Sequence, residues 1–205
     1  MPGESIVHVV DDDLAVRQSL SFLLASDGLA VRLYDSALAY LDKMHDTIGC
    51  IVTDVRMPGM DGIEFLRELK VRGSTLPVIV ITGHADVPLA ISAMKEGAAD
   101  FIEKPFADDV FLGSVRGVLD KLAKTIHHQQ QVAECRSRLK LLSERERQVL
   151  DGLLAGKANK VIAFDLDISP RTVEIYRANA MSKMQAGSLS ELVRMVLQAD
   201  EDRAA

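Results

Sequence analysis

Five short apolar runs constrain the fold of this chain more than any other feature of its sequence. They lie at 6–10, 29–33, 49–53, 77–82 and 99–103, and each begins 20 to 28 residues after the previous one. The segments between them, such as 14–26 and 63–71, repeat apolar residues every three or four positions, as amphipathic helices do. Strands that alternate with helices of this length predict a doubly wound α/β domain with a five-stranded parallel sheet.

Polar residues stand where four of these strands end. They are Asp11, Asp12 and Asp13 after the first run, Asp54 after the third, Thr82 at the end of the fourth and Lys104 after the fifth. In such sheets, ligands bind beyond the carboxyl ends of the strands, so we expect these side chains to meet. Clustered carboxylates repel one another unless a cation compensates, and oxygen ligands suit Mg²⁺.

This arrangement predicts a site for a phosphoryl group. The acids would hold Mg²⁺, one carboxylate would be the nucleophile, and Thr82 and Lys104 would bind phosphoryl oxygens. An alternative for the first strand is that Asp13 caps the following helix, while Asp11 and Asp12 are solvated acids of a loop.

A change of character near residue 114 marks the end of the first domain. Apolar residues then recur every three or four positions as far as Leu142, interrupted by the polar stretch 127–131, and no Gly or Pro occurs between Val118 and Gly152. Either the last helix of the first domain continues as a helical linker, or this segment is a frayed polar linker. We expect a first domain over 1–124, a linker over 125–139 and a second domain over 140–205.

The second domain has no strand pattern and is expected to be small and all-α. Ser143 followed by Glu146 forms a capping box before an apolar stripe, and a second helix begins near Asn159. Ser169 is the expected N-cap of a third helix, with Pro170 at its first position. A helix, a short turn and a capped helix are the parts of a helix-turn-helix motif.

Composition excludes several classes of protein. Hydrophobic residues make up 48% of the chain, which is too many for a disordered protein, and its two cysteines form neither a disulfide scaffold nor a CxxC metal motif. The first residues show neither a signal peptide nor a membrane span, so we expect a cytoplasmic protein without membrane contact. The net charge is −6, but the second domain is mildly basic once the acidic tail 200–202 is set aside, which permits a nucleic-acid partner.

Four separated motifs in the first domain, VVDDD, VTDVRMPGMDG, VITG and DFIEKPF, carry a resemblance. In order and spacing they resemble the receiver domain of two-component response regulators, which has a flavodoxin-like fold. The resemblance implies that Asp54 is the phosphoacceptor. It implies that Mg²⁺ is held by Asp11, Asp12, Asp54 and the backbone carbonyl of Arg56, and that Thr82 and Lys104 contact the phosphoryl group. It further implies a switch of Thr82 with Phe101, which stands where Tyr is commoner, and a cis peptide before Pro105.

The second domain resembles the LuxR-type, or NarL-type, DNA-binding domain through LSERERQVL, NKVIAFDLDIS and RTVEIYRANAMSKM. In that family the second helix of the motif enters the major groove. Exposed positions near its start are expected to face the bases, and nearby cations to contact phosphates. The expected base-facing residues are Arg171, Thr172, Glu174 and Ile175, and the expected phosphate contacts are Lys160, Arg177 and Lys183. A further helix over 188–199 forms the dimer contact on DNA in this family.

Taken as a whole, the chain resembles response regulators of the FixJ type, in ITGHADVPLAISAMKEGAADFIEKPF and in LSERERQVL with DLDISPRTVE. This implies a transcription regulator, typically an activator, that a sensor histidine kinase phosphorylates on Asp54. The phosphorylated homodimer would bind double-stranded promoter DNA, with RNA polymerase as a further partner and nitrogen-fixation or oxygen-responsive genes as targets. Such a regulator is not an enzyme, apart from self-catalysed phosphorylation and dephosphorylation.

A different class of protein fits part of the same pattern. A haloacid-dehalogenase-type, Mg²⁺-dependent phosphatase would use Asp11 as nucleophile and would draw on Thr82, Lys104 and the acids 108–109. That alternative gives no role to Asp54, and it leaves residues 142–199 without a function.

Overall fold

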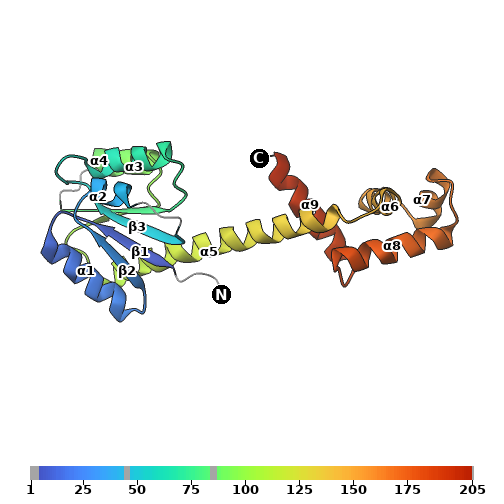
Figure 1. Cartoon of the computed structure of the whole chain (residues 1–205), viewed down its shortest axis with the longest axis horizontal. Helices are drawn as coiled ribbons and strands as arrows, with labels where there is room; N and C mark the ends of the chain where they lie inside the picture. Colours follow the sequence, from blue (N-terminus) through green and yellow to red (C-terminus); the bar gives the residue numbers. More distant parts are fainter. Residues whose placement is uncertain (1–4, 44–46, 84–86, 205) are drawn as a thin grey trace. The chain divides into compact units, whose positions relative to one another are not determined.

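The computed structural model describes residues 5–43, 47–83 and 87–204 (Figure 1). The chain divides into two compact units between Lys124 and Thr125. In the described part of the chain, none of the helices is both long enough and apolar enough to cross a lipid bilayer.

The first unit is built on a parallel sheet in the order β2-β1-β3-β4-β5, which confirms the predicted fold. Its strands are β1 (Ile6–Val10), β2 (Ala30–Tyr34), β3 (Gly49–Asp54), β4 (Val78–Thr82) and β5 (Asp100–Glu103). The helices between them are α1 (Leu14–Ser26), α2 (Ala37–Asp42), α3 (Gly62–Val71) and α4 (Val87–Lys95). In this strand order, β1 and β3 flank the point where the winding reverses, and that is where such sheets bind ligands.

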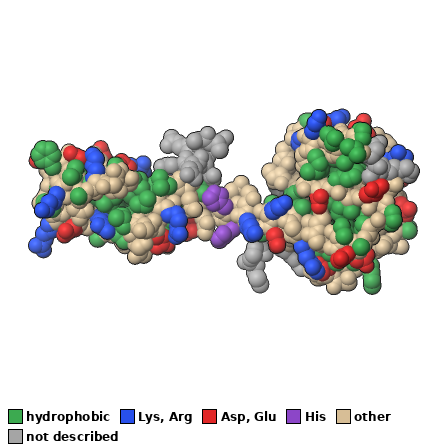
Figure 2. All heavy atoms as spheres, turned by 180° about the vertical axis from the view of Figure 1, so that it is seen from behind, with side chains coloured by type: hydrophobic (Ala, Val, Ile, Leu, Met, Phe, Trp, Pro, Cys, Tyr) green, Lys and Arg blue, Asp and Glu red, His purple; other side chains and the backbone are tan. Residues whose placement is uncertain are grey.

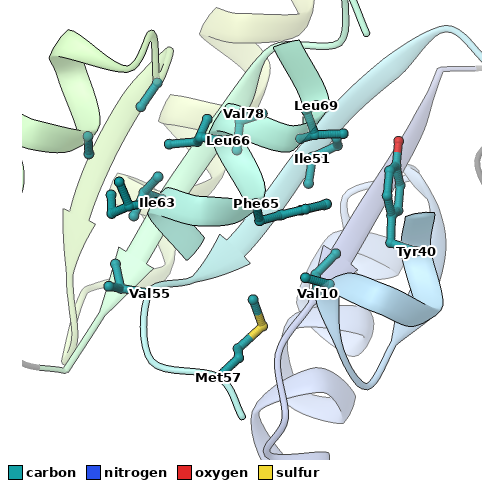
Figure 3. Packing of buried hydrophobic residues seen from close by; sticks show 14 of the residues in the cluster. Val10, Tyr40, Ile51, Val55, Met57, Ile63, Phe65, Leu66, Leu69 and Val78 are labelled. Atoms are coloured by element: carbon teal, nitrogen blue, oxygen red, sulfur yellow. The ribbon is translucent and has the colours of Figure 1, made fainter. Parts of the chain in front are cut away.

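Helices cover both faces of the sheet, because side chains along each strand alternate between the two faces. Val9 and Leu24 belong to one buried cluster, with α1 and with residues 111–118 of the helix that follows β5; Val10 and Phe65 belong to the other, with α2 and α3. Figure 3 shows Phe65 in this second cluster, between the sheet and α3, with Tyr40 of α2 nearby. An apolar core on each face of the sheet thus holds the strand ends in place.

The last helix of the first unit, α5 (Asp108–Leu139), is continuous through the polar stretch 127–131. Of the two possibilities for this segment, the helix is therefore the one observed. The helices that follow are α6 (Glu144–Leu154), α7 (Asn159–Asp165), α8 (Pro170–Met184) and α9 (Leu189–Ala204). The predicted caps are present, with Ser143 and Glu146 forming a capping box at α6, and Ser169 capping α8 before Pro170.

The end of α5 belongs to the core of the second unit. Val132 and Cys135 are buried in one cluster with residues of α6, α8 and α9. Arg136 Nη2 donates to the Ala199 carbonyl of α9 at 2.8 Å, and Arg138 Nη1 donates to the Met184 carbonyl at the end of α8 at 3.0 Å. The unit groups residues 125–205, whereas we expected a second domain that starts at 140. The difference arises because contacts distant in sequence complete its core.

Candidate functional site

Three carboxylates gather at the carboxyl ends of two adjacent strands. Asp11 and Asp12 follow β1, Asp54 ends β3, and the pairing of Val10 with Thr53 brings the two strand ends level. One oxygen of each side chain lies within 4.8 Å of the others, and among the described residues no other group of this kind could hold a metal ion. Carboxylate oxygens that converge in this way are ligands for a hard cation such as Mg²⁺.

Lys104 joins two of these acids. Its Nζ donates to Asp11 Oδ2 at 2.8 Å and to Asp54 Oδ2 at 3.2 Å. The lysine follows β5, and its backbone N–H donates to the Thr82 carbonyl of β4 at 2.8 Å, which ties the two strand ends together. The peptide before Pro105 is cis, as the resemblance implied. Groups that are 93 positions apart in the sequence therefore meet at one edge of the sheet.

Burial and charge act in opposite directions in this site. Burial raises the pKa of Asp11 above its ordinary value, and the hydrogen bond from Lys104 offsets only part of that rise. Burial by itself would lower the pKa of Lys104, but the hydrogen bond and the negative charge of Asp11, together with Asp54, raise it. Lys104 contacts two of the three carboxylates, so negative charge remains in the cluster, and this donor set fits a divalent cation.

Exposure distinguishes the acids. The side chain of Asp11 is 1% exposed and that of Asp54 is 15% exposed. Asp12 is exposed, and with the exposed Arg56 it lines a depression of about 720 Å³ beside the cluster. A donor arriving from solvent therefore reaches Asp54, whereas Asp11 is enclosed. Asp13 is the N-cap of α1, because its carboxylate accepts from two N–H groups of the first turn.

The other predicted residues of this site lie on neighbouring strands. Thr82 is buried at the end of β4, and Phe101 of β5 is half-buried against the cluster that contains Phe65. Residues 84–86, which follow Thr82 and Gly83 in the sequence, lie outside the described part of the chain.

Gly62 is a further site residue, which the sequence pattern did not identify. It opens α3 behind the N-cap Asp61, and its N–H donates to the Val55 carbonyl at 2.8 Å. A β-carbon at this position would lie 2.3 Å from the Asp54 carbonyl oxygen, so a larger residue would displace the end of β3. The only sequence signal was a glycine directly after a capping aspartate in MPGMDG.

In the second unit, α7 and α8 form the predicted helix-turn-helix. Arg171, Glu174 and Ile175 of α8 are exposed, and Ile175 retains 53% of its accessible surface although it is apolar. Lys160 of α7 is exposed as well. Arg177 and Thr172 are half-buried, and the Thr172 hydroxyl lies 2.8 Å from the hydroxyl of the cap residue Ser169.

Lys183 differs from the other predicted phosphate contacts because it has partners inside the unit. Its Nζ donates to Glu146 Oε2 at 2.6 Å and to the Leu141 carbonyl at 3.2 Å. Glu146 is buried, and the hydrogen bond from Lys183 lowers the pKa of this carboxyl. The pair links the start of α6 to the end of α8, so a phosphate would have to compete with a carboxylate for Lys183.

Charge is mixed over the second unit. On the face in Figure 2, basic and acidic side chains are interspersed and do not gather into one basic patch. Long-range electrostatic attraction between this face and a polyanion such as DNA is therefore weak. Short-range contacts from α8 then have to supply a larger share of the affinity.

Comparison with known proteins identifies both domains. Residues 7–116 match the model of the response regulator receiver domain, and residues 140–196 match that of the bacterial regulatory proteins of the luxR family. FixJ of Azorhizobium caulinodans is 58% identical over 96% of this chain and 94% of its own. FixJ of Bradyrhizobium diazoefficiens is 50% identical over 97% of this chain and 98% of its own.

Solved structures agree as well. Full-length FixJ from B. japonicum is 49% identical, covers 97% of this chain and 98% of its own, and has a TM-score of 0.63. The response regulator StyR is 36% identical, covers 96% and 100%, and has a TM-score of 0.80.

The phosphatase alternative has no support from these comparisons or from the geometry. Its nucleophile, Asp11, is enclosed and hydrogen-bonded to Lys104, and the acids it needs at 108–109 open α5 and do not follow a strand. Both family matches together span the receiver and the helix-turn-helix in one chain. The chain therefore belongs to the FixJ-type response regulators, transcription factors that combine a receiver domain with a LuxR-type DNA-binding domain.

Proposed function

We propose that Asp54 accepts a phosphoryl group from the phosphohistidine of a sensor histidine kinase. The observation that carries the proposal is Lys104, which bridges the enclosed Asp11 and the accessible Asp54 at the sheet edge. An Asp54 carboxylate oxygen forms the new P–O bond, the P–N bond to histidine breaks, and the departing imidazole nitrogen takes up a proton. The product is an acyl phosphate on Asp54.

Mg²⁺ would be held by Asp11, Asp12, Asp54 and the backbone carbonyl of Arg56, and when bound it neutralises charge on the phosphoryl oxygens. Lys104 would leave Asp11 and donate to a phosphoryl oxygen, and the Thr82 hydroxyl would donate to another. Because these groups all belong to one chain, we propose that the protein catalyses both its own phosphorylation by small donors and the hydrolysis of its acyl phosphate.

The switch follows from the charge that is added. A phosphoryl group brings about −1.5 to −2 charge and three strong acceptor oxygens to a site that already holds three carboxylates. Thr82 would be drawn toward these oxygens, and Phe101, which is only half-buried, would move into the space beside it. The surface changed in this way would be that of α4, β5 and α5.

Apolar exposure on α4 supports homodimerisation through this surface. Val87, Ile91 and Met94 are 72%, 49% and 51% exposed, and Ile91 and Met94 line a depression of about 410 Å³. Neighbouring apolar residues left open to water are typical of interaction sites. We propose that the phosphorylated receiver covers this patch with a second copy.

Beryllofluoride with Mg²⁺, which mimics the phosphoryl group, should raise the dimer content measured by sedimentation velocity and tighten DNA binding. Ile91→Asp should suppress the dimer, because each copy would bury a charge in the contact. The matched control is Val71→Asp, at an 81% exposed apolar position at the end of α3, which should dimerise as the wild type does. Equal monomer fractions with and without beryllofluoride would contradict the dimerisation step.

On DNA, we propose that α8 lies in the major groove of a promoter site. Arg171, Thr172, Glu174 and Ile175 would face base edges, with Glu174 accepting from a cytosine amino group and Ile175 contacting a thymine methyl. Lys160 and Arg177 would contact phosphates, which position the helix without reading sequence. The helix α9 would supply the dimer contact on DNA.

Lys160→Ala should weaken binding to all duplexes and flatten the dependence of log K on log salt by about 0.9, the value for one phosphate contact. Lys183→Ala is the matched control. It should leave the slope unchanged and lower the free energy of unfolding by about 1–2 kcal/mol, because Glu146 loses its partner. Fluorescence anisotropy at several salt concentrations and urea unfolding measure the two effects. An altered slope in Lys183→Ala would restore Lys183 as a phosphate contact.

The cellular role rests on the likeness to FixJ. We propose that the protein is a cytoplasmic activator that recruits RNA polymerase, with nitrogen-fixation or oxygen-responsive genes as its targets. Sequencing of the promoter fragments bound by the phosphorylated chain tests this assignment, and enrichment of unrelated genes would contradict it.

A further inference from the structure

Arg17 is a cation beside the acid cluster for which the mechanism above has no role. Its Nη1 donates to the backbone carbonyl of Asp11 at 2.5 Å, and the side chain is half-buried. That carbonyl belongs to the peptide between Asp11 and Asp12. The guanidinium therefore holds the backbone that carries both acids expected to bind the metal.

The position of Arg17 in α1 is electrostatically unfavourable. It is the fourth residue after the N-cap Asp13, and its side chain reaches back past the cap toward the helix N-terminus. Cations are disfavoured at this end of a helix, because the N–H groups there carry partial positive charge. The hydrogen bond to the Asp11 carbonyl offsets part of this cost, so the arginine is held by the end of β1 and not by its own helix.

Arg17 and Lys104 contact different parts of Asp11. Lys104 contacts the carboxylate, and it has to leave when a divalent cation and a phosphoryl group enter. Arg17 contacts the carbonyl, so its hydrogen bond persists when Lys104 moves. A second support comes from the Asp13 N–H, which donates to Asp11 Oδ1 at 2.9 Å. Of these contacts, the arginine is the one that orients the peptide itself.

We propose that Arg17 is a positioning residue for the divalent cation, which fixes the peptide between Asp11 and Asp12 so that both carboxylates converge. The inference rests on the proposed Mg²⁺ site. Residues that orient metal ligands typically change metal affinity 10- to 100-fold when they are replaced, without touching the metal. The chemistry of phosphoryl transfer on Asp54 stays as it is once the cation is bound.

Titration calorimetry of the full chain with MgCl₂ tests the inference, together with the rate of phosphorylation by acetyl phosphate at saturating Mg²⁺. Arg17→Met keeps the apolar stem but has no donor, and it should raise the Kd for Mg²⁺ about tenfold while the saturating rate stays within about twofold. Arg17→Lys and Arg17→Gln can each donate one hydrogen bond, and both should restore the Kd to within about threefold of the wild type.

Three results would overturn the inference. The first is a wild-type Kd in Arg17→Met, and the second is a reduced saturating rate at an unchanged Kd. The third is tighter Mg²⁺ binding in the Met and Gln variants but not in Lys, which would show that Arg17 acts by charge repulsion. If Arg17→Met does not fold, Arg17→Ala, which also has no donor, replaces it under the same criteria. A wild-type chain that binds no Mg²⁺ would refute the metal site itself and the inference with it.

Discussion

Replacing Asp54 with Asn should abolish phosphorylation by acetyl phosphate and Mg²⁺, and with it the phosphodonor-dependent gain in DNA binding. The amide lacks the nucleophilic oxygen pair that forms the acyl phosphate. The fold should survive, because Asn can still accept the hydrogen bond that the Val55 N–H donates to Asp54 Oδ1 at 2.7 Å. Lys104 also keeps its bond to Asp11. Intact-mass spectrometry measures the phosphoryl group, and anisotropy with a promoter duplex measures the output.

The matched control is Asp108→Asn, which changes an exposed acid in the first turn of α5. This variant should be phosphorylated and should respond like the wild type. Peptide mapping must place the modification on Asp54 in both phosphorylated proteins. Phosphodonor-dependent DNA binding that persists in Asp54→Asn would refute the proposed switch, and a modified Asp11 would revive the phosphatase alternative.

Removing the end of α5 should destabilise the DNA-binding unit strongly. A fragment of residues 140–205 lacks Val132, Cys135 and Leu139, which pack against α8 and α9, and the two arginines that bond to the carbonyls of Met184 and Ala199. Burying three such side chains contributes about 4–6 kcal/mol, and ordering the helix costs part of this. Compared with 125–205, we expect the free energy of unfolding to fall by roughly 3 kcal/mol in urea titrations followed by circular dichroism.

A second pair of variants separates the arginine contacts from the apolar ones. In the fragment 125–205, replacing Arg136 and Arg138 with Met should cost about 1–3 kcal/mol, since the Ala199 carbonyl within α9 and the Met184 carbonyl at the end of α8 lose charged donors. Gln131→Ala, at an exposed position of the same helix, should change the free energy of unfolding by less than about 0.5 kcal/mol. Equal urea midpoints for the two fragments would show that the module is complete from residue 140.

Features that depend on neighbouring residues could be predicted from the sequence. The strands end within about one residue of the apolar runs, because a strand covered by helices on both faces is apolar throughout and the polar residues after each run mark its end. The caps at Ser143 and Ser169 were predictable for the same reason, since cap and N–H lie three residues apart. The grouping of Asp54, the proposed phosphoacceptor, with Asp11, Thr82 and Lys104 was predictable because parallel strands place all their carboxyl ends at one edge.

Features that join distant segments required the tertiary structure. Lys183 looked like a free surface cation in the helical pattern, yet it pairs with Glu146 at a separation of 37 residues. From the sequence, the polar stretch 127–131 fitted either a helix or a frayed linker. In the structure α5 continues through it, because Val132 and Cys135 pack on α9. Gly62 has a space requirement that only the approach of α3 to the Asp54 carbonyl reveals.

By itself, the sequence determined the order of strands and helices, the caps and the set of groups at the sheet edge, because each of these follows from periodicity or from contacts within one turn. Tertiary structure alone decided which of those groups are enclosed, which cations are already paired, and that the end of α5 packs into the second compact unit. Burial and ion pairing depend on side chains that are tens of residues apart in the sequence. A local sequence pattern does not show which of these distant side chains will come into contact.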